Sequence, residues 1–68
     1  MSVARVTEII ASSPQSFEDA VEKGMQRAAK TLKNVRSGWV ESQKVMCDDN
    51  GNITEFRVNL KVTFVLQD

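Results

Sequence analysis

The chain has 68 residues, enough for one small domain, and its nine basic residues balance nine acidic ones to give a formal net charge of zero. This balance argues against nucleic acid or an anionic membrane as a partner, since both favour a basic excess. One cysteine and no histidine exclude an internal disulfide and a histidine-containing zinc site, which leaves oligomerisation as the way to stabilise so small a core.

The sequence has no apolar run near the roughly 18 residues of a membrane span, and Met1–Ala11 lacks the pattern of a signal peptide. The lone Cys47 is compatible with a reducing compartment. We therefore predict a single domain over residues 1–68 that is soluble and cytoplasmic.

The first predicted element is a strand at Val3–Ala11, because the segment is rich in β-branched residues. Val6 and Ile10 lie on one side of it, and Val3 and Ile9 on the other. Apolar residues on both sides are typical of a strand that is covered on both faces.

A helix is predicted next, starting at Ser16, which forms a capping box with Asp19. Small and apolar residues then recur at helical spacing and indicate an amphipathic helix of about five turns. This stripe consists of Phe17, Ala20, Val21, Gly24, Met25, Ala28 and Leu32. Glycine inside a helix costs about 1 kcal/mol relative to alanine, so Gly24 indicates a close approach to a neighbouring element.

The second predicted strand, Val35–Cys47, alternates poorly. The segment Asp48–Asn52 follows as a hairpin turn, in which Asn50-Gly51 supplies positive φ angles. Turns of two and of three residues would place opposite sets of side chains on one face, so the register stays open, and a β-bulge is compatible with the pattern.

The clearest signal is Asn52–Leu66, where apolar and polar residues alternate strictly. A strand of this length spans about 43 Å, whereas a compact chain of this size is only about 28 Å across. The strand should therefore project past the helix and carry apolar side chains that one protomer cannot cover. Because exposed apolar strands promote aggregation, we expect a closed homo-oligomer.

Few residues offer chemistry. Cys47 has no evident base partner, so catalysis is not expected. Asp48 and Asp49 place carboxylates in one short loop, as hard cations prefer, although the same residues also suit a plain hairpin turn. Trp39 is either a stacking platform for a flat ligand or an anchor between subunits. Arg57 is either a ligand contact or the ion-pair partner of Glu41 or Glu55.

Several segments, in their order and spacing, resemble the dodecin family. They are Thr7-Glu8-Ile9-Ile10 before Ser12-Ser13-Pro14, Phe17-Glu18-Asp19-Ala20-Val21, Arg27-Ala28-Ala29-Lys30-Thr31-Leu32 and Val58–Leu66. The resemblance runs through nearly the whole chain. It implies a hollow spherical homododecamer whose protomers each wrap a three-stranded antiparallel sheet around one helix.

Many dodecins stack flavins in pairs between tryptophans near the symmetry axes, as a flavin store or buffer. The stacking tryptophan of the family falls on Ser37 here, and the glutamine that bonds the flavin ring falls on Arg57, so neither role carries over. Trp39, on the same face as Ser37, offers a substitute platform or fills the pocket. A similar branch of the family is described as binding calcium, with Asp48 and Asp49 as candidates here.

The resulting prediction is an α+β fold with the order β-α-β-β. The predicted function is a non-catalytic homododecameric shell that stores or buffers a small ligand: a flavin (riboflavin or FMN), calcium or another small molecule. The predicted ligand-binding residues are Ser37, Trp39 and Arg57, and the predicted metal ligands are Asp48 and Asp49. The alternative is a homo-oligomeric interaction subunit that docks its long last strand against another protein.

Overall fold

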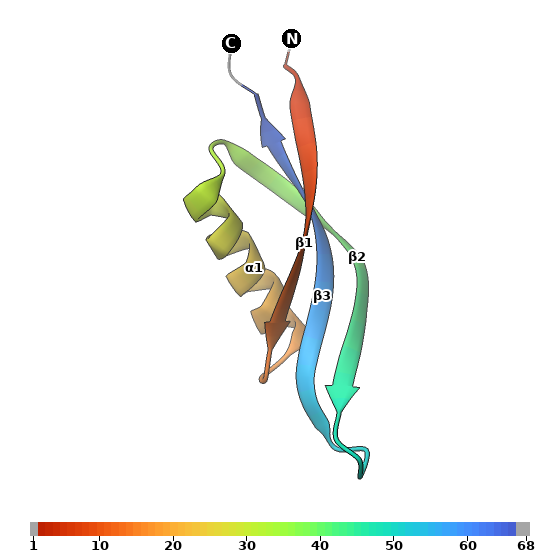
Figure 1. The fold of residues 1–68 in the computed structure, drawn as a ribbon. Coiled ribbons are helices and arrows are strands. Elements are labelled where there is room, and N and C mark those ends of the chain that lie inside the picture. Colours follow the sequence, from red (N-terminus) through yellow and green to blue (C-terminus); the bar gives the residue numbers. More distant parts are fainter. Residues whose placement is uncertain (1, 67–68) are drawn as a thin grey trace.

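The computed structural model describes residues 2–66 and confirms the predicted β-α-β-β order. The elements are β1 (Ala4–Ser13), α1 (Phe17–Thr31), β2 (Val35–Cys47) and β3 (Ile53–Val65). The strands form one antiparallel sheet, and α1 lies across one of its faces (Figure 1). We call this side the helix face and the opposite side the helix-free face. Within the described residues, no helix is long and apolar enough to cross a membrane.

The protomer is elongated, with principal extents of 52 × 19 × 14 Å. The 13 residues of β3 span about 43 Å, whereas the 15 residues of α1 cover only about 22 Å. The β2–β3 hairpin consequently runs well beyond the N-terminal end of α1 (Figure 1). The predicted projection of the last strand past the helix is therefore confirmed.

The last strand is central, since the sheet order is β1-β3-β2. β3 pairs with β1 over residues 56–65 and with β2 over residues 53–64, so both of its edges are occupied over residues 56–64. A strand paired on both sides cannot join the sheet of another protein. Docking of the last strand onto the sheet edge of another protein, the alternative prediction, is therefore contradicted over these residues.

Capping positions α1 as the sequence predicts at its start, but not at its end. The Ser16 hydroxyl accepts a hydrogen bond from the backbone N–H of Asp19 at 3.0 Å. At the other end, Leu32 has extended backbone angles and Asn34 has a positive φ of 61°. The helix therefore ends after about four turns rather than five.

Small residues bring α1 close to the sheet. Ala20, Gly24 and Ala28 are the buried residues of the helix. A Cβ atom at Gly24 would lie 2.8 Å from the Cβ of Ala11 and 2.9 Å from the Leu60 side chain. This confirms the predicted close approach. The core lies where α1 covers the middle of β3, whose helix-facing residues Val58, Leu60 and Val62 are fully buried.

The poor alternation of β2 has a structural cause. The pairing of β2 with β3 shifts between Val35 and Ser37, between Val40 and Ser42, and between Met46 and Cys47. The first two shifts place an extra residue in β2, and each reverses which set of its alternate residues faces the helix, whereas the third places the extra residue in β3. The compatibility with a bulge noted from the sequence is thus confirmed. At the hairpin, Gly51 has the predicted positive φ, at 81°.

Candidate functional site

The helix-free face carries all three predicted ligand-binding residues. Ser37 pairs with Thr63 and Trp39 pairs with Lys61 across β2 and β3. Since paired residues in an antiparallel sheet point to the same side, these side chains share the face opposite α1. Trp39 is 63% exposed, so in one protomer its ring is open to an incoming ligand or a neighbouring subunit.

Arg57 lies on the same face but farther along the sheet. Its partner on β2 is Lys44, whereas the partner of Trp39 is Lys61. Lys61 and Arg57 are four positions apart along β3, which amounts to about 13 Å between their Cα atoms. In one protomer, therefore, only a ligand that spans most of this distance contacts both Trp39 and Arg57.

Two ion pairs order the charges of this face. The Lys61 Nζ lies 3.3 Å from the Glu41 carboxylate. The Arg57 Nε donates to Glu55 at 2.6 Å, and this hydrogen bond lowers the pKa of Glu55. Of the two carboxylates that sequence reasoning offered Arg57, the structure thus selects Glu55. Both pairs are partly exposed, so each is worth little in stability.

A hollow of about 300 Å³ opens beside Arg57 on the helix-free face. Its lining residues come from all three strands: Ile10, Ser42, Gln43, Lys44, Arg57, Val58 and Asn59. The side-chain oxygen of Asn59 is buried and has no hydrogen-bond partner in the described chain. Such an atom is costly unless something outside the protomer satisfies it. Sequence reasoning missed Asn59, because alternation places it on a polar face without showing that its oxygen is buried.

The predicted cation loop is a self-contained turn. The Asp48 Oδ1 accepts from the backbone N–H groups of Asn50 and Asn52, at 2.9 and 3.0 Å. These bonds, chiefly that from Asn52, lower the pKa of Asp48. Residues 2–66 contain no group of three potential metal-ligating His, Cys, Asp or Glu side chains. Asp48 and Asp49 would therefore need other oxygen ligands, from amides, backbone carbonyls, water or another copy of the chain, to hold a cation.

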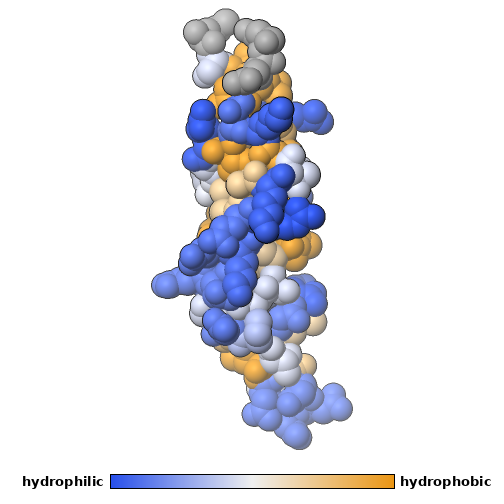
Figure 2. All heavy atoms as spheres, turned by 90° about the vertical axis from the view of Figure 1, so that its left-hand side faces the viewer, coloured by the Kyte–Doolittle hydropathy of each residue, from blue (hydrophilic) through white to orange (hydrophobic). Residues whose placement is uncertain are grey.

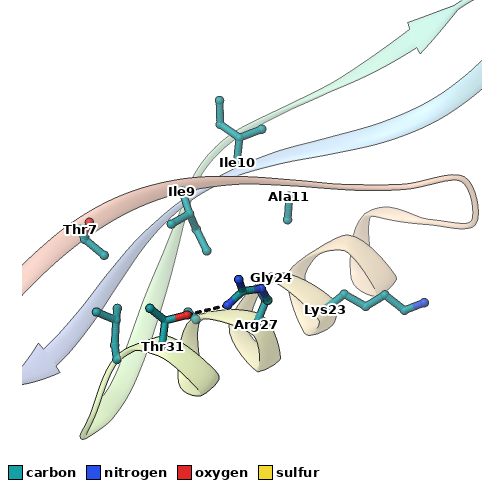
Figure 3. A pocket seen from close by; sticks show the side chains of 10 residues that line it. Thr7, Ile9, Ile10, Ala11, Lys23, Gly24, Arg27 and Thr31 are labelled. Carbon is teal, nitrogen blue, oxygen red and sulfur yellow. Dashed lines mark hydrogen bonds between the residues drawn. The ribbon is translucent and has the colours of Figure 1, made fainter.

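A second, larger hollow of about 540 Å³ lies on the helix face, between β1 and α1 (Figure 3). Ile9 and Ala11 point into it from β1, and Gly24 lies opposite them on α1. Lys23 and Arg27 stand at the helix side, and Arg27 donates a hydrogen bond to the Thr31 hydroxyl. The sequence signals for a strand and a helix do not reveal this groove, because it depends on how the two elements lie against each other.

Hydrophobic surface remains exposed beyond the reach of α1. Figure 2 shows the side of the molecule on which α1 lies, with a hydrophilic band across its middle and hydrophobic surface on either side of that band. On the sheet, Ile10 is 73% exposed and Ile53 is 55% exposed. All but the first residue of β2 are exposed as well. The exposed apolar surface is therefore spread over β1, β2 and the ends of β3, while the centre of β3 is covered by its own helix.

Comparison with known proteins gives one consistent family. A sequence model of the dodecin family matches residues 3–67. The calcium dodecin of Mycobacterium tuberculosis is 37% identical over 67 residues, which cover 98% of this chain and 93% of that protein.

Solved structures with the same fold are also dodecins. A dodecin from Streptomyces davaonensis superposes with a TM-score of 0.92 at 33% identity, covering 98% of this chain and 97% of that one. A structure of the M. tuberculosis calcium dodecin, described as calcium-chelating and as having a novel calcium-binding site, has a TM-score of 0.83 at 35% identity. It covers 97% of this chain and 93% of that one. With a family match over nearly its whole length and the same fold as these structures, the chain belongs to the dodecin family.

Proposed function

We propose that this chain assembles into a homododecameric, non-catalytic shell in the cytoplasm and binds a small ligand there. The dodecin family is one of ligand-binding proteins rather than enzymes, which supports the absence of catalysis. The whole of residues 1–68 acts as a single domain in this proposal. Ser37, Trp39 and Arg57 contact the ligand from the helix-free face.

The observation that carries the proposal is how little of the sheet one protomer covers. The two most exposed large apolar side chains, Ile10 at 73% and Trp39 at 63%, both lie on the helix-free face. Exposed apolar surface of this kind marks an interface in soluble proteins. The separation of about 13 Å between Trp39 and Arg57 is compatible with a ligand site that a second copy completes.

Calcium is the first ligand to consider, because the M. tuberculosis relative is a calcium dodecin. Asp48 and Asp49 would contribute carboxylates from several copies to one cation, as oxygen-rich calcium sites require. Flavin is the second, on the strength of the family resemblance. Ser37 offers no ring to stack on, and Arg57 offers no amide that could both donate to and accept from a flavin.

Mass in solution tests the assembly. Twelve copies of the 7.6 kDa chain give about 91 kDa. Light scattering and sedimentation at neutral pH should show this mass, and it should persist on dilution to nanomolar concentration. A folded monomer or dimer under these conditions would contradict the proposal.

Ligand binding is tested separately. Calcium is titrated calorimetrically into the chelator-treated protein, with Asp48→Asn plus Asp49→Asn as the variant that should lose binding. Riboflavin is titrated while flavin and Trp39 fluorescence are followed. The double variant Ser37→Trp plus Arg57→Gln restores the family pair and should quench flavin fluorescence more strongly than the natural chain. Binding of neither calcium nor riboflavin would leave both ligand assignments wrong.

A further inference from the structure

The groove between β1 and α1 lies on the opposite side of the sheet from the proposed ligand-binding residues. Its volume of about 540 Å³ falls within the roughly 300–1,000 Å³ that small-molecule sites usually have. Its lining extends over about 13 Å along β1, from Thr7 to Ala11, and over about 10 Å along α1, from Gly24 to Thr31. Because β1 is an edge strand, no further strand within residues 2–66 covers the groove on its outer side.

The walls of the groove are aliphatic. Ile9 and Ala11 line it from β1, and Ala28 and Leu32 line it from α1. Ile9, Ala11 and Leu32 are only partly buried, so apolar surface beside the core stays uncovered here. None of the 10 lining residues is aromatic, so the groove offers no flat surface on which a ring could stack. An aliphatic chain suits these walls better than a flat ligand does.

Arg27 brings a positive charge to this groove (Figure 3). The lining contains two charged side chains, Lys23 and Arg27, and no carboxylate. The Lys23 Nζ lies 3.6 Å from the Asp19 carboxylate, whereas Arg27 makes no salt bridge within residues 2–66. Arg27 donates to the Thr31 hydroxyl through Nη1, which leaves its other guanidinium N–H groups and the Thr31 O–H as donors. The groove therefore offers hydrogen-bond donors and one unpaired positive charge beside an apolar surface.

We infer that this groove binds an aliphatic monocarboxylate, a ligand of the fatty-acid class. The carboxylate accepts hydrogen bonds from Arg27 and Thr31, since the planar guanidinium fork matches a carboxylate in charge and in shape. The aliphatic chain lies along Ile9 and Ala28 and covers apolar surface that the protomer leaves open. This site is separate from the one proposed on the helix-free face, and neither depends on the other.

The test titrates three probes into the assembled protein. They are decanoate, decanol, which has the same chain without the charge, and hexanoate, which has the same charge on a shorter chain. Calorimetry at low salt and neutral pH should show decanoate binding, with decanol about tenfold weaker and hexanoate at least about tenfold weaker. Methyl NMR locates the site: decanoate should shift the methyl signals of Ile9 and leave those of Ile53, which is exposed and outside the groove, unchanged.

Two arginine substitutions test the charged contact. Arg27→Gln should weaken decanoate binding about tenfold and leave decanol binding unchanged, because only a charge-assisted contact is lost. Arg36→Gln, the same change at an exposed arginine outside the groove, should alter neither. Both positions are exposed, so light scattering should give both variants the mass of the natural chain.

Four results would overturn the inference. One is the absence of decanoate binding at millimolar concentration, which is also the result expected if another copy covers the groove in the assembly. The others are equal affinity for decanoate and decanol, equal effects of the Arg27 and Arg36 substitutions, and displacement of decanoate by riboflavin. Failure of decanoate to bind a protein that does bind calcium or riboflavin would remove this site alone and leave the proposed function intact.

Discussion

The two faces of the sheet differ in how completely one protomer finishes them. On the helix face, Val58, Leu60 and Val62 are at most 1% exposed. On the helix-free face, Ile10 and Trp39 keep well over half of their surface. The centre of β3 is thus closed on the helix side, while the opposite side of the sheet is open. The single helix α1 covers only one face of the sheet, so the other face remains open to ligands or to further copies of the chain.

The largest expected loss of stability comes from a substitution in the core beneath α1. Leu60→Ala should lower the free energy of unfolding by about 2–5 kcal/mol, because it opens a cavity under α1. Chemical denaturation at fixed protein concentration measures it. Ile53→Ala, at an exposed apolar position of the same strand, is the matched control and should change stability by about 0.5 kcal/mol or less. Similar losses of unfolding free energy for the two variants would mean that the buried and the exposed positions of β3 contribute equally to stability.

Neighbouring isoleucines on β1 compare the faces directly. Ile9 packs against the core and Ile10 points to the helix-free face. Ile9→Ala should cost about 2 kcal/mol whatever the protein concentration. Ile10→Ala should instead shift dissociation of the assembly to higher protein concentration, measured by sedimentation over a dilution series. An Ile10 variant with unchanged dissociation would show that no copy covers this residue.

Gly24 measures how tightly the helix face is packed. Gly24→Ala would gain about 1 kcal/mol in helix propensity, but its Cβ meets the Ala11 Cβ at 2.8 Å. Since neither a methyl group nor the backbone that carries it can swing away, we expect a net loss of about 1–3 kcal/mol. Thermal and denaturant unfolding measure it. A stabilised variant would show that α1 can move away from the sheet.

The smallest effect is expected on the helix-free face, at the Glu55–Arg57 pair. The bond from Arg57 lowers the pKa of folded Glu55, so the carboxylate stabilises the fold above its unfolded pKa and loses this contribution as pH falls through its folded pKa. Glu55→Gln should therefore lower the melting temperature slightly at pH 7 and match the natural chain in acid. A constant difference at all pH values would mean that the effect is not ionic.

Sequence alone determined the elements and their order. Ser16 as helix cap, Gly24 as a contact point and Gly51 as the turn residue with positive φ all follow from local geometry, which depends on near neighbours in the chain. The alternation of β3 likewise shows its buried face without reference to any other strand. The family resemblance rested on these same local segments and is confirmed.

Tertiary structure alone decided how the strands combine. It placed β3 in the centre, separated Trp39 from Arg57, and set Lys44 beside Arg57 next to the unpaired Asn59 oxygen. The physical reason is that the register between strands depends on many contacts far apart in sequence, and one bulge reverses every side chain beyond it. Alternation within a single strand carries no information about what its neighbour presents.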